Sequence, residues 1–366
     1  ATLVAIAAAG LVQPVAGRIS DGIGRRVVMA VGIGLAGVGL AVMVSSAGST
    51  LVFVGLLLAL VGVSIAQAGQ QALLPDHVDS AQRGVASGLK GAFDVGGALL
   101  AFIILAALLA SGQPTVAAVS MFGVLALSAA VGLALLGRRR VGSRDAVHAR
   151  ADRAVKSSLV AIVAARFLLL LGVYAVGRFM FLFVADAWAL SPDEAAAQAG
   201  LALTALAALT VAASVPAGWL ADRVGRRPVM LAGAVLAAAG IALVPFTRDV
   251  SGLIVAGALL ALGSAAFGSA SWAALSDAVD PQRSGWHLGL AHLGTAGAAA
   301  AAGLFGLIID YGNGMGPLTG YTAAFALAAT AALAGGIAAW RLVPGMPGGA
   351  KATPITTHAT ASAEAR

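Results

Sequence analysis

Two charged residues inside a long apolar run are the first candidates for chemistry. Lys90 and Asp94 are the only charged residues of the run at 85–110. A charge within a membrane-spanning helix costs roughly 2.5–3.5 kcal/mol on insertion scales, so such residues are functional candidates. Asp94 lies about 16 Å along a helix from Arg83, and Lys90 shares its face. Asp94 is therefore either a carboxylate that binds a coupling proton or cation, or half of a neutralised structural pair with Lys90.

Two arginines in the run at 158–185 form a second candidate group. Arg166 and Arg178 flank Tyr174 and lie about 40° apart around an ideal helix. If both faced one cavity, they would attract an anionic substrate. The position of Arg166 favours a side chain that extends to the cytoplasmic interface. Arg178, with Tyr174, stays a candidate contact for substrate or coupling ion.

A polar turn interrupts the apolar run at 51–74. The equivalent segment of the repeat, in the second half of the chain, is also polar. Such side chains either hydrogen-bond a polar solute or join neighbouring helices. A tryptophan there either stacks on a ring of the solute or marks the membrane interface. These residues are Gln67, Gln70 and Gln71 in the first half, and Ser269, Ser271 and Trp272 in the second.

Metal and hydrolytic chemistry have little support in the sequence. The chain has no cysteine, which excludes a thiolate metal site. His287 and His292 are five residues apart, a poor spacing for sharing one metal ion on a helix. No zinc-protease motif, phosphate-binding loop or nucleophile elbow occurs. We therefore predict no enzyme, no cofactor and no metal, with His292 as a group that titrates in a cavity.

A short charged motif occurs twice and reveals duplicated halves. It reads G-x-x-x-D-x-x-G-R-R at 17–26 and again at 218–227, and each copy stands between two long apolar runs. The same spacing aligns a second set of residues, including Asp76 with Asp277. Two separate matches at one spacing predict an internal repeat.

The repeated motif resembles the cytoplasmic signature loop of the major facilitator superfamily of transporters, and the resemblance covers essentially the whole chain. It implies two parallel six-helix halves that rock about a cavity midway through the membrane. It also implies that charged pairs latch the two halves together on the cytoplasmic side. The residues of this predicted latch are Gly17, Asp21, Gly24, Arg25, Arg26, Asp76, Gly218, Asp222, Arg223, Gly225, Arg226, Arg227 and Asp277.

The two motif acids have a local interpretation as well. Asp21 and Asp222 stand just before the next apolar runs, where an acid caps free amides and meets the positive end of the helix dipole. The arginines that follow are expected to pair with Asp76 and Asp277. The alternative is that the motif residues only mark topology and cap helices.

Two departures from the family pattern matter. Gly22 stands where the family usually has a base, as Arg223 does in the second copy, so we expect a weaker first latch. Ala92 and Phe93 replace the Gly-Pro pair that superfamily antiporters often carry. The second departure weakens the interpretation as a drug/proton antiporter.

Composition places all of these residues in a membrane protein. Of 366 residues, 60% are hydrophobic and 10% charged, and apolar runs of about 20 residues fill nearly the whole sequence. Long continuous runs predict helices and not the alternating strands of a barrel. The predicted fold is an all-α polytopic membrane protein with two pseudo-symmetric bundles. Its eleven predicted helices are 1–16, 27–45, 51–74, 85–110, 115–137, 158–185, 197–217, 228–246, 251–275, 286–309 and 321–342.

An odd number of helices predicts a chain that is truncated at its N-terminus, from a parent with twelve. Four regions follow from the pattern. They are an N-terminal bundle without its first helix at 1–137, a basic linker at 138–157, a six-helix bundle at 158–342 and a disordered tail at 343–366.

The basic residues predict orientation. The net charge is +7, yet on the predicted topology only Arg248 falls in a loop opposite the signature loops. Anionic lipid headgroups and the bilayer, and not nucleic acid, are therefore the expected partners of the basic residues. We predict a multi-pass protein of the plasma (inner) membrane, in a bacterium, with linker and C-terminus in the cytoplasm.

The predicted function is a secondary active transporter that moves a small solute by alternating access. Coupling to a proton or cation gradient through Asp94 makes it a symporter. Two alternatives stay open: a transport-inactive sensor or scaffold, and a drug/proton antiporter.

Overall fold

The computed structural model describes residues 2–45, 48–112, six positions between 116 and 127, and 152–280 and 283–343. Every regular element in these ranges is a helix, and nine segments among them are long and apolar enough to cross a membrane. This confirms the all-helical membrane architecture. Most of the predicted helix at 115–137, most of the linker and nearly all of the tail lie outside the described residues, so the count of eleven helices stays a prediction.

The helices follow the apolar runs and extend them by a few residues. The first half contains α1 (Thr2–Ile23), α2 (Arg25–Ser45), α3 (Ser49–His77), the 3₁₀ turn η1 (Ser80–Gln82) and α4 (Arg83–Ala110). The second half contains α6 (Asp152–Trp188), α7 (Pro192–Val224), α8 (Arg226–Leu243), η2 (Val244–Phe246), α9 (Val250–Ala278), α10 (Ser284–Ala301), η4 (Ala302–Leu304), α11 (Phe305–Asn313) and α12 (Thr319–Leu342).

Several of the predicted boundaries differ from the structure; α6, for example, begins six residues earlier than expected, at Asp152. The helix expected at 1–16 continues to Ile23, and the helix expected at 197–217 continues to Val224, so most of each signature motif is helical. The helix expected at 286–309 occurs as two helices, α10 and α11, joined by the 3₁₀ turn η4. A stretch rich in alanine and glycine has no sequence signal for such a tightening, which packing decides.

A single glycine makes each signature turn. Gly24 lies between α1 and α2 with φ of 101°, and Gly225 lies between α7 and α8 with φ of 106°. Backbone of this kind is disfavoured for residues with a Cβ, so glycine is required at both positions. The second glycine of the motif therefore forms a one-residue turn between the two flanking helices, which run antiparallel to each other.

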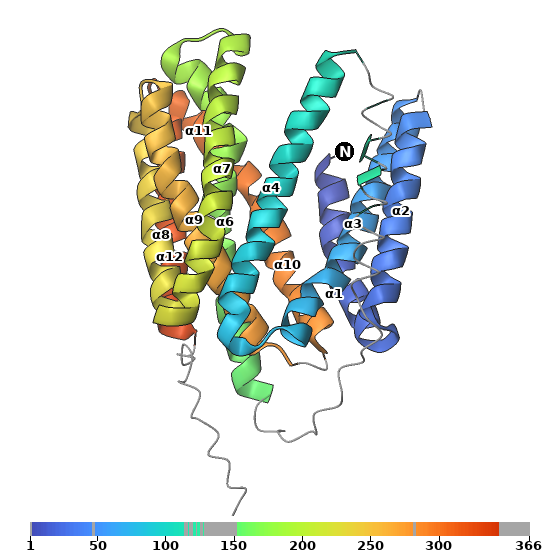
Figure 1. Cartoon of the computed structure of the whole chain (residues 1–366). Helices are drawn as coiled ribbons and strands as arrows, with labels where there is room; N and C mark the ends of the chain where they lie inside the picture. Colours follow the sequence, from blue (N-terminus) through green and yellow to red (C-terminus); the bar gives the residue numbers. More distant parts are fainter. Residues whose placement is uncertain are drawn as a thin grey trace, which may run out of the picture.

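The two halves stand side by side, and two helices pack across between them (Figure 1). Within the halves, α2 packs on α3, α8 on α9, and α12 on both α6 and α8. Across the halves, α4 packs mainly on α7 and α9, while α10 packs on α1 as well as on α6. These two crossings, α4 with α7 and α1 with α10, are related by the internal repeat.

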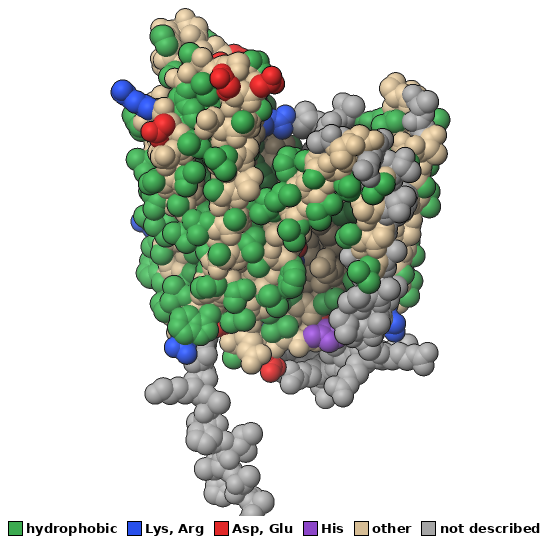
Figure 2. All heavy atoms as spheres, turned by 45° about the horizontal axis from the view of Figure 1, so that its top comes forward, with side chains coloured by type: hydrophobic (Ala, Val, Ile, Leu, Met, Phe, Trp, Pro, Cys, Tyr) green, Lys and Arg blue, Asp and Glu red, His purple; other side chains and the backbone are tan. Residues whose placement is uncertain are grey.

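The outer surface fits a lipid environment. Figure 2 shows hydrophobic side chains over the middle of the face in view, with Lys, Arg, Asp and Glu gathered towards the two ends. Large apolar side chains stand exposed on both halves, among them Phe102 and Leu307, each 68% accessible. Exposed apolar surface of this extent is typical of contact with membrane or partner.

Glycines bring the crossing helices into backbone contact at one end. A Cβ on Gly17 would lie 2.1 Å from the carbonyl oxygen of Gly285, and a Cβ on Gly218 would lie 2.1 Å from that of Gly84. Small residues allow such close approach between membrane helices. We call this end, which carries the Gly24 and Gly225 turns, the loop end; it is the lower end in Figure 1.

The crossing helices separate towards the opposite end, which we call the far end. Along α4, the nearest α7 atom to an added Cβ is at 2.2 Å for Gly88, 3.7 Å for Gly91 and 3.4 Å for Gly96. No atom lies within 4 Å of that position at Gly97. Among the described residues, the backbones of α4 and α7 approach most closely at the loop end, and the two ribbons diverge towards the far end (Figure 1).

We expect Gly218→Ala to destabilise the protein, because the added methyl group meets the backbone of Gly84. Overpacking of this kind costs about 1–3 kcal/mol. Gly34→Ala is the matched control, since a Cβ there has no atom within 4 Å. Thermal unfolding in detergent measures both; equal midpoints for the two variants would contradict close contact between α4 and α7.

Candidate functional site

The motif acids cap helices of the opposite half, and not the helices that follow them. The Asp21 carboxylate at the end of α1 accepts hydrogen bonds from the backbone N–H groups of Gly285 (2.9 Å) and Trp286 (3.0 Å) in α10. Asp222 in α7 accepts from those of Gly84 and Val85 in α4, both at 2.8 Å. The predicted cap chemistry occurs, but its target was wrong, because the close crossing brings another helix N-terminus nearer.

The first arginine of each motif joins these carboxylates to the predicted acids. Arg25 bonds Asp21 at 2.5 Å and Asp76 at 3.1 Å. Arg226 contacts Asp222 and lies 3.4 Å from Asp277. Both predicted pairings are therefore present as contacts. Each ion pair lies within one half, but the same arginines also donate across the halves, Arg25 to the Ser284 hydroxyl at 2.7 Å and Arg226 to the Ser80 carbonyl oxygen at 2.9 Å.

The second arginine of each motif was also assigned to the latch. Arg26 is exposed and Arg227 is half-buried. Arg223, the base that the first copy lacks, lies over the ring of Trp219 in its own helix, 4.0 Å from the centroid. Arg223 thus packs along α7 and not across the interface, and the absence of a base at Gly22 gives no reason for a weaker first latch.

Two residues that the sequence reasoning did not assign complete the contacts across the halves. Arg83 donates to the Asp277 carboxylate (2.9 Å) and to the Ser276 carbonyl oxygen (2.9 Å) in α9. At the equivalent position of the repeat stands Ser284, whose hydroxyl donates to Asp76 at 3.1 Å. The repeat spacing aligns Arg83 with Ser284 and could have identified the pair.

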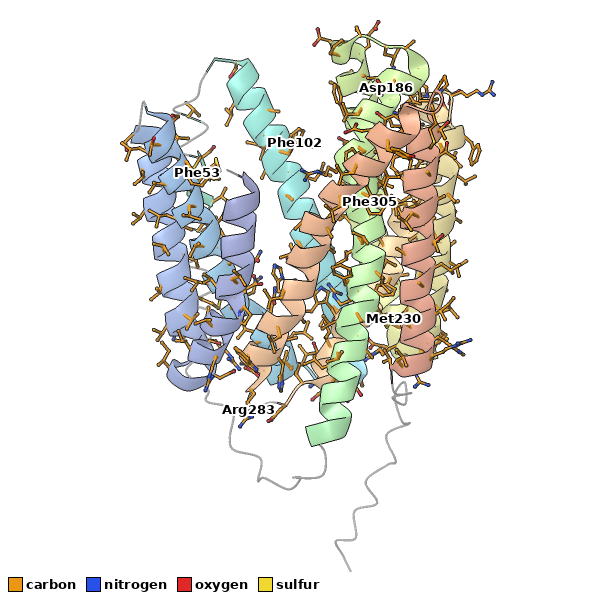
Figure 3. All side chains as sticks on the ribbon, turned by 180° about the vertical axis from the view of Figure 1, so that it is seen from behind. Phe53, Phe102, Asp186, Met230, Arg283 and Phe305 are labelled. Atoms are coloured by element: carbon orange, nitrogen blue, oxygen red, sulfur yellow. The ribbon has the colours of Figure 1, made fainter. Side chains whose placement is uncertain are left out.

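The two contacts therefore differ in charge. The contact of α4 with α7 and α9 contains the ion pair of Arg83 with Asp277, whose side chains are 17% and 9% accessible. The contact of α1 and α3 with α10 has a hydroxyl group in place of that cation. Figure 3 places Arg283, next to Ser284, at the loop end, with Asp186 of α6 at the far end.

A second group of polar side chains lies deeper between the halves. Lys90 and Asp94 form the predicted ion pair on α4. The Lys90 ammonium lies 4.7 Å from the ring centroid of Trp272 in α9, and the Arg166 guanidinium of α6 lies 4.6 Å from the same centroid. Two cations from opposite halves thus share one aromatic ring. We call this group, with the glutamines and His292 below, the central cluster.

Arg166 does not extend to the interface, which corrects the preferred interpretation of the sequence. It is 6% accessible, and its Nη1 donates to the Ser271 hydroxyl at 2.5 Å. Arg178, twelve residues on, is exposed and lies beside Gly303 in η4. The two arginines therefore do not share a site. Tyr174 is half-buried between them on α6.

The predicted glutamine turn divides between two environments. Gln67 accepts a hydrogen bond from Gln13 of α1 (3.2 Å), and Gln71 lies 3.5 Å from the ring Nδ1 of His292 in α10. Gln70 is exposed. Ser269 donates to the Ser214 carbonyl oxygen at 3.0 Å, which is the interhelical bond considered for it.

The central cluster lies directly behind the loop-end contacts. Gln71 is five residues from Asp76, and Trp272 is five residues from Asp277, which is about 8 Å along each helix. Asp94 is farther along, and its side chain is 49% accessible against 16% for Lys90. Within the described residues, no group of three or more potential His, Cys, Asp or Glu ligands could hold a metal ion.

The comparisons with known proteins agree with this architecture. The family model described as Major Facilitator Superfamily matches residues 1–191 and again 167–364. The chain belongs to the Major Facilitator Superfamily. No curated protein sequence matches it.

Solved structures share the superfamily fold at low sequence identity. The human organic anion transporter MFSD10 (TETRAN) has a TM-score of 0.75 at 15% identity, over 92% of this chain and 82% of that one. The proton:xylose symporter XylE, bound to 6-bromo-6-deoxy-D-glucose, has 0.73 at 16%, over 94% and 85%. The E. coli fucose:proton symporter FucP has 0.73 at 15%, over 92% and 89%. These likenesses concern the fold.

In this superfamily member, we expect Asp222→Asn to loosen the loop end. The change removes a charge that accepts two backbone N–H groups of α4 and pairs with Arg226. Hydrogen bonds to a charged group contribute about 1.5–3 kcal/mol each, so the separated state should rise about tenfold or more. Alkylation of Ser214→Cys, a buried position between α7 and α4 in a chain without cysteine, measures the change.

Asp79→Asn is the control for this measurement. Asp79 is an exposed acid at the same end, and its side chain makes no capping hydrogen bond to η1. An alkylation rate unchanged by Asp222→Asn, or raised equally by Asp79→Asn, would show that the cross-half cap does not hold this end together.

Proposed function

We propose that this protein is a secondary active transporter that moves a small solute across the plasma (inner) membrane by alternating access, coupled to a proton or cation gradient through Asp94. The observation that carries the proposal is the central cluster. It joins side chains of both halves directly behind the loop-end contacts, so a movement of the halves changes its surroundings and its access together.

The gating role of the loop end follows from its chemistry. The contacts that join the halves there include carboxylate caps, the ion pair of Arg83 with Asp277, hydrogen bonds of arginine to Ser284 and to backbone carbonyl groups, and backbone contacts through glycine. Such polar contacts re-form with water when separated, whereas a large apolar interface would not open readily. We assign the predicted latch to the caps of Asp21 and Asp222 together with Arg83 and Ser284. Arg25 and Arg226 pair with Asp76 and Asp277 within each half and also donate across the interface, to the Ser284 hydroxyl and the Ser80 carbonyl oxygen.

The described state is closed at the loop end and divergent at the far end. With the basic linker at 138–157 and the C-terminus in the cytoplasm, this is an outward-open arrangement. A structure of FucP in the outward conformation has a TM-score of 0.71 with this chain, so the arrangement is compatible with that state. Rocking of the halves would then open the loop end and expose the central cluster to the cytoplasm.

Coupling rests on the pair of Lys90 with Asp94. In the charged form, the Asp94 carboxylate neutralises Lys90 on the same helix face. Protonation of Asp94 removes that counter-charge, so the Lys90 ammonium group is then without a paired negative charge on α4. Because Lys90 also contacts Trp272 of the other half, proton binding alters a contact between the halves. The exposed fraction of Asp94 gives a proton access from the far end.

We expect Asp94→Asn to abolish accumulation driven by a pH gradient and to retain solute exchange, because the variant keeps the side-chain shape and loses the titrating group. The measurement reconstitutes the full chain in liposomes and compares gradient-driven uptake with counterflow for a panel of neutral sugars and small organic acids. Asp193→Asn, an exposed acid in the first turn of α7, is the control.

Each outcome separates the candidate functions. Full accumulation by Asp94→Asn with unchanged pH dependence would remove the coupling role and leave Lys90 and Asp94 as a structural pair. Exchange of internal protons against an external cationic drug would favour the antiporter. Absence of counterflow for every solute, in a chain that remains folded, would favour the sensor or scaffold.

A further inference from the structure

The central cluster has more positive than negative charge. Its cations are Lys90 and Arg166, and its only acid is Asp94, which is already paired with Lys90. His292 is the remaining titratable ring, and Tyr174 the nearby phenol on α6. The stretch from 113 to 137, of which only six positions are described, contains no Asp or Glu, so its sequence supplies no further counter-charge.

Arg166 has no close counter-ion, because Asp94 interacts with its charge only from beyond ion-pair distance. Among the described residues, no carboxylate oxygen lies within 4 Å of it, and its Nε–H has no hydrogen-bond partner although the side chain is 94% buried. A guanidinium carries several N–H donors in a planar fork that matches a carboxylate. A buried charge without a partner is strongly unfavourable, so this fork is a binding position for an anion.

Two buried amides of the first half border the cluster, Gln71 beside His292 and Gln13 beside Gln67, which lies one turn before Gln71 on α3. The buried amides of Gln13 and Gln71 each have one end paired and an oxygen without a partner. His292 links the two sides, because it lies beside Gln71 and is close enough to Lys90 and Arg166 to interact with their charges. An occupant that satisfies both sides has a negative end towards Arg166 and hydrogen-bonding hydroxyl groups towards the glutamines.

We propose that the central cluster binds a small hydroxylated carboxylate, with its carboxylate group on Arg166 and its hydroxyl groups on Gln13 and Gln71. This inference rests on the proposed function, since it names the solute class for the same site. Lys90 is the second cation of the site. When Asp94 is protonated, Lys90 is released to the anion, so proton and solute stabilise each other's binding.

The test measures binding without requiring transport. Trp272 lies against both cations, so its fluorescence reports on the site once Trp188, Trp219, Trp286 and Trp340 are replaced by Phe in the full chain. Three matched pairs serve as probes: lactate with lactamide, glycerate with glycerol, and gluconate with glucose. We expect at least one acid to change the fluorescence saturably and its neutral partner to bind at least about tenfold more weakly, a difference of about 1.4 kcal/mol.

Variants of α6 identify the residue responsible. Arg166→Gln should raise the dissociation constant of the acid at least about tenfold, and Arg166→Lys should restore part of the loss because it retains the charge. Arg248→Gln, an exposed arginine in the loop before α9, should leave it unchanged. If Arg166→Gln does not fold, Lys90→Gln should weaken the acid and not its neutral partner.

The contrary results are distinct from a failure of transport. Equal binding of acid and neutral partner, no response to any of the three acids, or full affinity in Arg166→Gln would each overturn the anion site. Counterflow of glucose or glycerol that is independent of Arg166 would support the transporter and overturn the anion site. Acid binding that depends on Arg166 without any counterflow would support the anion site and contradict the transporter.

Discussion

The architecture depends on two carboxylates that cap helices of the opposite half. Asp21 and Asp222 accept hydrogen bonds from backbone N–H groups in the first turns of α10 and α4. The close glycine contacts beside these groups leave little room for water to bind them instead. The glycines allow the backbones to approach, and the acids make that approach favourable. Neither works without the other: without glycine the carboxylates do not reach, and without the acids the close contact buries unpaired N–H groups.

This arrangement also positions the central cluster. Helices α4 and α10 each pack against the other half at the loop end. As a result, Lys90 of α4 lies next to Trp272 of the second half, and His292 of α10 lies next to Gln71 of the first half. Arg166 becomes buried because α6 and α9 pack around it, and its charge lies where water is scarce. The site is therefore a product of the crossing of the helices and not of any one segment.

The sequence predicted local and repeated features well. Lys90 and Asp94 form a pair because their spacing places them on one helix face, and the repeat correctly placed Asp76 and Asp277 near the motif arginines. Features that depend on packing between distant segments were not predictable. The spacing of Asp222 to Arg226 does not reveal that α4 begins beside it, and Arg166 has the same local sequence whether it is buried or extends to an interface. The turn η4 has no signal in its alanine-rich sequence.

The unequal pair of Arg83 and Ser284 has a consequence for how a duplicated protein moves. Two identical halves would separate along their symmetry axis with no preferred order. Here one side of the interface contains a full ion pair, and the other a hydroxyl group that bonds Arg25 and Asp76, so under the proposed rocking we expect the side of Ser284 to part first. The duplicated halves therefore do not make equivalent contacts across the interface.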